Sequence, residues 1–370
     1  MNGKSTIFKQ LAKAAFAIAA ATALLIPTTT KAGGNSDEPF DAGAMIMHHV
    51  LDAHEIHIVG DFGIYLPVIL LDDGIVVFSS NDLYHGVEKT ITIDGKEENY
   101  FSANGYSFMH EHVYKGETLT TEMVEGESHI TNGHPLDFSI TKNVVGMLLG
   151  GLLLILIMTQ VAKGYKKNEG KAPNGIQNLI EPFVLFVRDE VAKPSIGHKY
   201  AYYMPYLLTV FFFIWIGNLI GLIPFLGGIN FTGNIAVTLV LATFTFIITS
   251  YRANSGYWKH IVSPPGVPAA LLPIMLPIEI IGVFSKPIVL MLRLFANITA
   301  GHIILLAFTS LIFIFAETYG AAGGLGVSVV SVAFSIFMTF LELLVAFLQA
   351  YVFTLLSALY FGMATEEAHH

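Results

Sequence analysis

Long apolar runs separated by short polar segments dominate the second half of the chain. An α-helix rises 1.5 Å per residue, so about 20 apolar residues cross a hydrocarbon core about 30 Å thick. Hydrophobic residues make up 54% of the sequence and charged residues 13%. The pattern predicts a polytopic α-helical membrane protein with about five spanning helices, at residues 143–161, 202–224, 234–251, 287–317 and 327–362.

The last two predicted helices are separated by the glycine-rich segment 319–326. Both exceed the minimum crossing length, so they should tilt strongly or extend beyond the hydrocarbon core. We therefore expect a long, tilted C-terminal hairpin of antiparallel helices. In such a hairpin, residues at equal depth have numbers with a constant sum, so polar residues that share a sum should lie close together.

Two segments do not fit a simple span. Residues 176–191 mix charged and apolar positions, which is typical of an amphipathic helix at the inner membrane surface. Residues 264–287 contain six prolines, each of which removes a backbone donor and crowds the preceding turn. We predict a bent or partly inserted segment there instead of one straight spanning helix.

The first 32 residues have the pattern of a signal peptide. Three lysines precede the apolar run 14–26, and the composition becomes polar after Ala32. We expect residues 1–32 to be removed after export, with cleavage near Ala32. A retained membrane anchor is the alternative.

Residues 33–140 form a predicted domain of different character. They hold nineteen of the 28 acidic residues, three lysines and nine of the fourteen histidines. Short alternating runs at 55–59, 74–78 and 89–93, with Asp-Gly turns at 73–74 and 94–95, predict a small β-rich domain. Lysines 163, 166, 167 and 171 follow the first predicted span, so the positive-inside rule places that loop and the C-terminus in the cytoplasm and the acidic domain in the periplasm.

The histidines of this domain gather near its start. Imidazole and carboxylate groups are good ligands for zinc or copper, and both occur at His48, His49, His54, His57, Asp52 and Glu55. Their spacing matches no closed metal-site template, and solvated histidines at a domain edge are commoner. The chain has no cysteine, which excludes disulfides, thiolate metal sites and thiol nucleophiles. We expect no metal and no cofactor, and a structural or docking role for the domain.

Arg293 is the most unusual residue of the predicted hairpin. It is the only lysine or arginine in the last 84 residues and lies inside an apolar run. An arginine at the centre of a membrane helix costs about 2.5 to 3.5 kcal/mol on insertion scales, so such residues usually face a bundle interior or wet cavity and have a function. Asn297 lies one turn later and about 40° around the helix, whereas His302 lies about 180° around it.

Two polar pairs should meet across the hairpin. The numbers of Arg293 and Gln349 sum to 642, and those of His302 and Glu342 sum to 644. Alone, Gln349 or Asn297 most often makes an interhelical hydrogen bond, and His302 is most often a core histidine. A carboxylate such as Glu342 is expensive at membrane depth unless it is protonated, paired or hydrated. The set as a whole therefore favours an ion path over a purely structural role.

The segments that carry these residues resemble a known family. Residues 286–301 (KPIVLMLRLFANITAG), 348–360 (LQAYVFTLLSALY) and 363–367 (MATEE) closely resemble subunit a of rotary F-type ATP synthases. Weaker similarity at 173–181, 213–218 and 234–238 extends the resemblance over roughly 138–367. It implies a membrane domain at 141–370 that conducts ions within a complex and makes no ATP by itself.

The resemblance implies a role for each polar residue. Arg293 corresponds to the family's essential arginine, Asn297 to its asparagine and Gln349 to its late glutamine. Many bacterial members have a glutamate after the Ala-Gly and a histidine seven residues before the glutamine. This chain has His302 and Glu342 at those positions, so the pair is exchanged.

In such a subunit, Arg293 would face the carboxylates of a rotating c-ring. An opposite charge within about 4 to 6 Å lowers the pKa of a carboxylate by roughly 1 to 3 units, so the arginine would favour deprotonation of each ring site as it passes. Arg293 would also separate an exit path near Glu279 from an uptake path near Asn297, His302, Glu342 and Gln349.

The resemblance also implies partners. These are the c-ring, the subunit b stalk, the bilayer of the bacterial inner membrane and protons, with sodium as the alternative ion; no nucleic acid is expected. A stand-alone proton-coupled transporter is the competing function, but no second copy of the arginine motif occurs in 138–260, where an internal repeat would place it. A docking protein, the third reading, would leave the membrane arginine and carboxylate unexplained.

Overall fold

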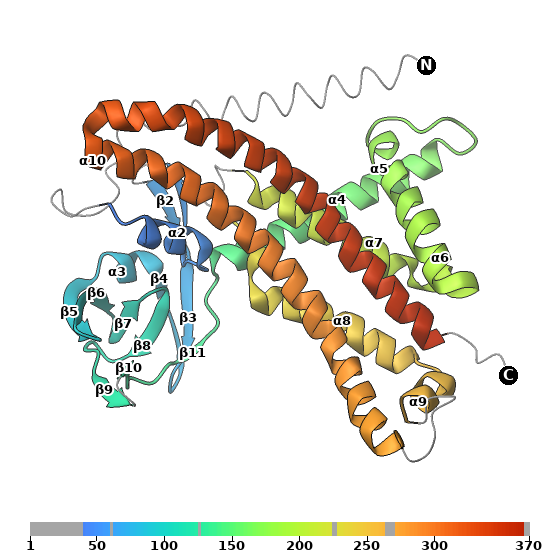
Figure 1. The fold of residues 1–370 in the computed structure, drawn as a ribbon, viewed down its shortest axis with the longest axis horizontal. Coiled ribbons are helices and arrows are strands. Elements are labelled where there is room, and N and C mark those ends of the chain that lie inside the picture. Colours follow the sequence, from blue (N-terminus) through green and yellow to red (C-terminus); the bar gives the residue numbers. More distant parts are fainter. Residues whose placement is uncertain (1–39, 60–61, 125–126, 224–227, 263–270, 366–370) are drawn as a thin grey trace. The chain divides into compact units, whose positions relative to one another are not determined.

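The computed structural model describes residues 40–365 apart from 60–61, 125–126, 224–227 and 263–270 (Figure 1). The chain divides into two compact units. The β-rich unit comprises Leu51–Leu149 and Phe225–Phe231, and the helical unit comprises Met1–Val50, Gly150–Pro224 and Thr232–His370. The predicted signal peptide at 1–32 lies outside the described residues, so it stays a prediction.

The β-rich unit consists of antiparallel strands, as the alternating runs predicted. One sheet has the strand order β5-β6-β7-β8, another has the order β11-β3-β4, and two further pairs are β1-β2 and β10-β9. A short helix, α3 (Ser80–Tyr84), follows β4. The strands are β1 (Glu55–Val59), β2 (Phe62–Tyr65), β3 (Pro67–Leu71), β4 (Ile75–Ser79), β5 (Val87–Ile93), β6 (Lys96–Ala103), β7 (Tyr106–Met109), β8 (His112–Lys115), β9 (Thr121–Val124), β10 (Glu127–Ile130) and β11 (Leu136–Asp137).

The turns between these strands follow local chemistry. Asp94 and Gly95 have φ of 52° and 79° and join β5 to β6, which is the type I′ arrangement expected of an Asp-Gly hairpin. Asp73, at φ 49°, lies in the loop between β3 and β4, also as predicted. The turn between β7 and β8 was not predicted: His110 and Glu111 adopt φ of 49° and 65° without a glycine.

Alternate side chains of the strands fill the core of the β-rich unit. Val68 and Leu70 of β3 are fully buried and pack with Leu83 of α3 and with Phe108 and Val113 of β7 and β8. Because successive side chains of a strand point to opposite faces, the neighbours of Val68 and Leu70 on β3 lie on the other face of the β11-β3-β4 sheet.

The helical unit contains the segments that can span a membrane. Four helical stretches among the described residues are long and apolar enough to cross one: α4, Ile176–Gly221, α8 and α10. This confirms the predicted helical fold, while the number of spans and their orientation stay predictions. The elements are α2 (Ala42–Val50), α4 (Lys142–Lys167, which begins in the β-rich unit), α5 (Ile176–Phe186), the π-helix η1 (Val187–Ala192), α6 (Lys193–Ile196), η2 (Gly197–Lys199), α7 (Tyr200–Gly221), η4 (Phe231–Gly233), α8 (Ile235–Arg252), α9 (Ser255–Val262) and α10 (Leu272–Thr365).

The C-terminal hairpin is the longest feature of this unit. Figure 1 shows α10 folded back on itself as two long arms. The chain reverses at Gly320, whose φ of 72° and ψ of −174° belong to a region that only glycine readily adopts. The rings of Phe308 and Phe334 stack across the arms with centroids 5.0 Å apart.

The predicted turn at 319–326 was too long. Among these residues only Gly320 leaves the helical conformation, and the second arm resumes immediately after it. Gly324 serves close packing instead: a Cβ on it would lie 2.7 Å from the Cβ of Ala316 on the first arm. Glycine composition predicted the place of the reversal but not which glycine makes it.

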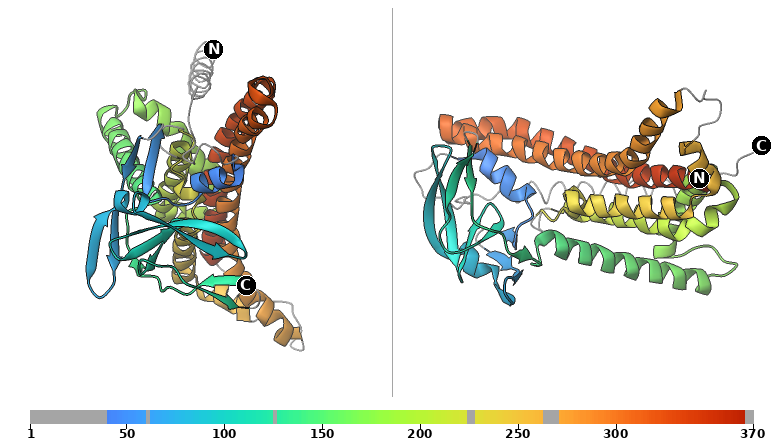
Figure 2. Two further views of the ribbon diagram at one scale, coloured as in Figure 1. Left: turned by 90° about the vertical axis from the view of Figure 1, so that its left-hand side faces the viewer. Right: turned by 90° about the horizontal axis from the view of Figure 1, so that it is seen from below.

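The described prolines of the segment 264–287 interrupt the chain less than expected, and those at 264, 265 and 268 lie outside the described residues. Helix α10 begins at Leu272 and continues through Pro277 and Pro287 with helical backbone angles. A proline removes one hydrogen bond, but long apolar helices tolerate this loss where neighbouring groups or local adjustments satisfy the freed carbonyl. Figure 2 shows the first turns of α10 angled away from the rest of the arm, so the segment is bent, as predicted, but not broken.

The hairpin packs on α7 and α8. Figure 2 shows α8 running alongside the arms. The apolar core includes Phe211 of α7 together with Leu290 and Phe353 of α10. A polar seam crosses it, because Thr245 of α8 contacts Tyr206 Oη at 2.7 Å and Ser357 Oγ at 3.3 Å. The segment predicted as an amphipathic helix, 176–191, is helical through α5 and η1.

A short helix that the sequence did not predict covers the far end of the hairpin. Helix α2 packs on α10, and Phe40, two residues before it, donates its backbone N–H to Glu317 Oε2 at 3.0 Å. The Phe40 ring also lies 5.2 Å from that of Phe313. Glu317 therefore anchors the segment that leads into α2.

Candidate functional site

Arg293 lies on the first arm of α10 with its side chain exposed. Large apolar side chains at a similar depth of the hairpin are also exposed, among them Leu292, Leu344 and Leu348. Among the residues that the structure describes, no carboxylate forms an ion pair with Arg293, although Tyr360 interacts with it electrostatically. A cation on an otherwise apolar helix surface requires a partner of opposite charge or water.

His302 and Glu342 meet across the two arms, as their shared sum predicted. Nδ1 of His302 lies 3.9 Å from Oε1 of Glu342, and the Glu342 side chain is 9% exposed. Neither carboxylate oxygen of Glu342 accepts a hydrogen bond from the described residues. At 3.9 Å the two groups are too far apart for a direct hydrogen bond, so a proton passing between them requires a side-chain rotation or a bridging water.

The residue before the histidine makes this approach possible. Gly301 has no side chain, and a Cβ added to it would lie 2.8 Å from Oε1 and 3.3 Å from Cγ of Glu342. A methyl group at this position would displace the carboxylate. Gly301 belongs to the family-like run 286–301, yet no sequence pattern assigned it a part in the site.

Asn297 and Gln349 lie on different sides of the hairpin. Asn297 is exposed on the same side as Arg293, one turn along, whereas Gln349 is buried. No hydrogen bond joins Arg293 to Gln349 among the described residues. Depth matching therefore placed the residues at similar levels, but equal depth did not mean contact, because the direction of each side chain decides that separately.

Asn218 is a site residue whose part the sequence did not reveal. It is buried on α7, donates a 3.0 Å hydrogen bond from Nδ2 to the Ala346 carbonyl, and accepts one from Thr232 Oγ1 at 2.6 Å. Ala346 lies between Glu342 and Gln349 on the second arm, so Asn218 ties that stretch to α7. The partners are far apart in sequence, and only the fold brings them together.

Two serines continue the polar positions toward the bend of the hairpin. Ser310 and Ser331 are both buried, and their numbers sum to 641, close to the sums of the predicted pairs. Ser310 donates to the Ala307 carbonyl, whereas Ser331 Oγ has no hydrogen-bond partner among the described residues. Applied to serines, the constant-sum rule predicts that Ser310 and Ser331 lie at similar depths.

Glu279, the predicted exit residue, lies in a second polar cluster near the start of α10. Lys286 lies 5.8 Å from the ring centre of Tyr257 and 5.6 Å from that of Tyr360. Glu279 interacts electrostatically with both Lys286 and Tyr257. A cavity between α8 and α10 opens here, lined by Lys286, Tyr257, Tyr360, Thr245 and Thr249.

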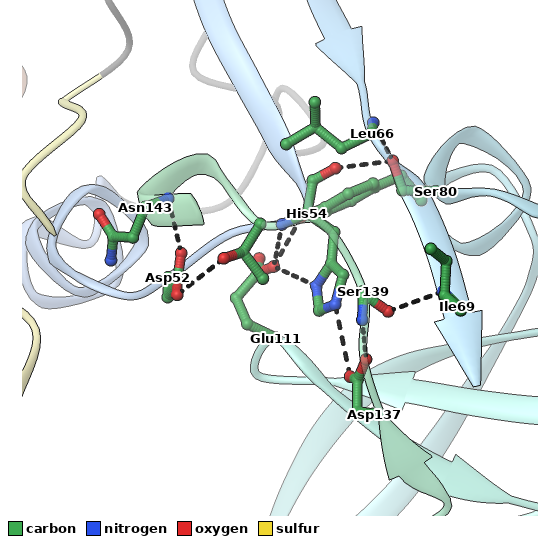
Figure 3. A network of polar contacts seen from close by, with 11 residues as sticks. Asp52, His54, Leu66, Ile69, Ser80, Glu111, Asp137, Ser139 and Asn143 are labelled. Atoms are coloured by element: carbon green, nitrogen blue, oxygen red, sulfur yellow. Dashed lines mark hydrogen bonds and ion pairs between the residues drawn. The ribbon is translucent and has the colours of Figure 1, made fainter. Parts of the chain in front are cut away.

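A buried polar network occupies the β-rich unit (Figure 3). His54 is 3% exposed, and each of its ring nitrogens lies 3.6 Å from a carboxylate oxygen, Nδ1 from Glu111 and Nε2 from Asp137. Tyr84 donates a 2.6 Å hydrogen bond to Glu111, and the Ser139 N–H donates one of 2.8 Å to Asp137. Donors other than the histidine therefore hold both carboxylates in place.

This environment makes His54 a cation at neutral pH. Burial lowers the pKa of His54, but the polar contacts and negative charges of Asp137 and Glu111 outweigh burial and raise that pKa from 6.5 to about 9. Burial would raise the pKa of Asp137, but its contact with His54 helps to lower it. The sequence placed His54 among candidate metal ligands. In the described part of the chain no group of three or more His, Cys, Asp or Glu side chains could hold a metal ion.

The fold and the hairpin together define a helical membrane protein whose long hairpin carries an exposed arginine and a buried histidine–carboxylate pair. The family model of the ATP synthase A chain matches residues 144–362. The chain belongs to this family of bacterial multi-pass membrane proteins. A subunit named ATP synthase subunit a 2 from Chlorobaculum tepidum is 46% identical over 269 residues, which cover 70% of this chain and 73% of that protein.

Other relatives show similar identity. ATP synthase subunit a of Chloroherpeton thalassium is 44% identical over 273 residues, covering 67% of this chain and 79% of that protein. ATP synthase subunit a 2 of Prosthecochloris aestuarii is 42% identical over 321 residues, covering 84% of this chain and 94% of that protein. Residues 45–138 match a second family model, described as a domain of unknown function (DUF8433).

Proposed function

We propose that this chain is the proton-translocating stator subunit of a rotary F-type ATP synthase and that Arg293 separates its two half-channels. The observation that carries the proposal is the placement of Arg293. It is exposed on an apolar surface of the hairpin and has no carboxylate partner among the described residues. A ring of subunits that each present a membrane carboxylate would supply the missing counter-charge as it turns.

The arginine has two effects on such a ring. Its positive charge within about 4 to 6 Å of a carboxylate lowers the carboxylate pKa by roughly 1 to 3 units, which favours proton release. Arginine side chains are fixed cations that do not relay protons, so Arg293 would also block passage from one half-channel to the other.

The uptake path runs along the inside of the hairpin in this proposal. His302 and Glu342 face each other within it, and the path also includes the buried Gln349 and Asn297, which is exposed one turn from the ring-facing arginine. Glu342 has no fixed hydrogen-bond donor, so it can exchange a proton with His302 or with water without first breaking a strong bond. The exchanged order of histidine and glutamate preserves this chemistry because the two groups still meet across the arms.

The exit path begins at the cluster of Glu279, Lys286, Tyr257 and Tyr360 beside α8. Its cavity is lined by hydroxyl groups and an ammonium group among apolar side chains. Protons released there would pass to the cytoplasm. Each charge that crosses 100 mV releases about 2.3 kcal/mol, so several protons per turn are needed to drive ATP formation elsewhere in the complex.

The proposed partners are the c-ring, the subunit b stalk and the bilayer, with the proton as the ion and sodium as the alternative. The chain is not catalytic alone. Purification of the tagged full-length chain from membranes in mild detergent tests this assembly. We expect ring subunits and the soluble ATPase head to co-purify with it. Their absence, with the chain intact and proton-conducting alone after reconstitution, would contradict the proposal and favour a stand-alone transporter.

A further inference from the structure

One face of the β11-β3-β4 sheet is apolar and points away from the core of the β-rich unit. The first row of this face contains Leu136, Leu71 and Ile75, because Leu136 pairs with Leu71 and Leu71 pairs with Ile75. The next outward row contains Phe138, Ile69 and Val77, because the Phe138 N–H donates to the Ile69 carbonyl and Ile69 pairs with Val77. The last row contains Ile140, Pro67 and Ser79. We call these nine residues the outer face.

The outer face is exposed and almost uniformly apolar. Ile75 is 76% exposed, Phe138 is 64% exposed, and Leu136 and Val77 are similar. Ser79 is its one polar side chain, and the Ser79 hydroxyl already accepts the Asn81 N–H at the start of α3. Contiguous exposed apolar patches of this kind mark sites of interaction with membranes or proteins.

Three features favour lipid as the occupant. First, the outer face is continuous with a membrane span, since Ile140 belongs to its last row and α4 begins two residues later, at Lys142. Second, the unit holds the first turn of this span directly. Asp52 accepts hydrogen bonds from Thr141 Oγ1 and the Asn143 N–H, and the Lys142 N–H donates to the Ala53 carbonyl. The sheet therefore stays within a few residues of the bilayer.

Third, the chemistry of the outer face does not suit a transient protein interface. Such interfaces are only about 56–58% apolar and carry roughly ten direct hydrogen bonds. The outer face offers no charged side chain and no uncommitted hydroxyl. A short tether also makes membrane contact effectively intramolecular, which favours even a modest apolar contact.

We propose that the outer face rests on the zwitterionic outer surface of the bilayer beside α4 and docks the β-rich unit on lipid. The unit is acidic, with nineteen acidic residues against three lysines in 33–140, so contact is apolar and independent of anionic lipid. Docking depends only on the chain being embedded in a membrane and does not require proton transport.

The absence of native cysteine allows a direct test. Single variants Ile75→Cys and Val77→Cys on the outer face are spin-labelled in the full-length chain, reconstituted in phosphatidylcholine bilayers. Thr92→Cys, exposed on β5, is the water-exposed control, and Leu152→Cys, exposed on α4, is the lipid-exposed control. Relaxation by molecular oxygen, which concentrates in lipid, is compared with relaxation by a water-soluble nickel chelate.

We expect the oxygen-to-nickel ratio at residues 75 and 77 to exceed that at Thr92→Cys several-fold and to approach that at Leu152→Cys. Salt or added anionic lipid should not change it. A ratio at 75 and 77 equal to that at Thr92→Cys would overturn the proposal, because the outer face would then lie in water. Protection from both reagents would also overturn it and would indicate a protein partner, such as a second copy.

A charge on the outer face provides a second readout. Val77→Glu should lower the ratio at Ile75→Cys toward the aqueous value, whereas Thr92→Glu should leave it unchanged. Hydrogen exchange of the β6 and β7 amides reports whether the unit remains folded in each variant. An unchanged ratio in the folded Val77→Glu variant would contradict docking on lipid.

Discussion

The chain contains two buried histidine–carboxylate contacts that differ in how the carboxylate is held. His54 lies between Glu111 and Asp137, and both carboxylates receive hydrogen bonds from other groups at 2.6 to 2.8 Å. His302 lies 3.9 Å from Glu342, whose two oxygens receive no hydrogen bond from the described residues. A carboxylate held by several donors stabilises one charge state, whereas one without fixed donors can change its proton at little cost.

Local backbone strengthens the contrast. Glu111 reaches His54 from a turn with φ of 65°, a left-handed conformation that costs a residue other than glycine about 1 kcal/mol or more. That strain persists because the ion pair and the Tyr84 hydrogen bond hold the turn. Glu342 instead lies on a regular helix and approaches its partner through the gap at Gly301. We therefore expect the first contact to affect stability and the second to affect proton exchange.

The largest effect is expected from removing the positive charge of Arg293. Arg293→Ala should abolish ATP-driven proton pumping in inverted vesicles while leaving assembly largely intact, because no other fixed cation lies on that surface of the hairpin among the described residues. Quenching of a pH-sensitive dye measures pumping. Arg252→Ala, at the end of α8, is the matched control and should retain it. Normal pumping by Arg293→Ala would contradict the proposed role of Arg293 between the two half-channels.

Exchange of the hairpin pair should have the next largest effect. Either single change, His302→Glu or Glu342→His, should slow pumping about tenfold, equivalent to about 1.4 kcal/mol in the barrier. The double variant restores one carboxylate and one imidazole in the order common in the family, so it should pump faster than either single variant. Strictly additive losses in this double-mutant cycle would argue against coupling between the two residues.

A methyl group at Gly301 should have a smaller effect on the same contact. Gly301→Ala places a Cβ 2.8 Å from Oε1 of Glu342, so the carboxylate must move and pumping should fall several-fold. Gly282 lies on the same arm with no atom within 4 Å of an added Cβ. Gly282→Ala should therefore pump normally. Equal rates for the two variants would show that the position of the Glu342 carboxylate does not matter.

The His54 contact should affect stability and leave transport unchanged. Because the folded pKa of His54, about 9, exceeds the unfolded value of 6.5, its stabilisation is fully present below pH 6.5 and disappears as pH rises through 9. The shift corresponds to about 3 kcal/mol. Hydrogen exchange of β-rich unit amides in the full-length chain should therefore accelerate between pH 7 and 10, after correction for the intrinsic rate.

The variant His54→Gln should remove this pH dependence and destabilise the unit at pH 7. His57→Gln is the matched control, because His57 is an exposed histidine on the neighbouring strand β1. A pH dependence that persists unchanged in His54→Gln would show that another group is responsible.

Much of the fold could be predicted where the signal is local. Alternation and Asp-Gly turns located strands β1, β4 and β5, because both depend on residues next to one another. The hairpin and its polar pair were predicted from length and a constant sum, because an antiparallel pair has only one free register. Helix α2 and the helical passage through Pro277 were missed, since packing against distant segments decides them.

The candidate site could likewise be predicted where the signal is local and not where it depends on distant contacts. Arg293, His302 and Glu342 stand out because charge is rare in an apolar helix. Asn218 could not be assigned a part, because its partner, the Ala346 carbonyl, lies 128 residues away and a backbone group carries no sequence signal. The His54 contact was missed for the same reason, since Glu111 and Asp137 approach from separate strands.

The most direct test compares one carboxylate from each contact in the same assay. Glu342→Gln and Glu111→Gln are measured side by side for proton pumping per assembled complex and for hydrogen exchange in the β-rich unit. We expect Glu342→Gln to lose pumping with unchanged exchange, and Glu111→Gln to pump normally while exchange in the unit accelerates. Normal pumping by Glu342→Gln, or loss of pumping by a fully assembled Glu111→Gln complex, would contradict the roles proposed for these two carboxylates.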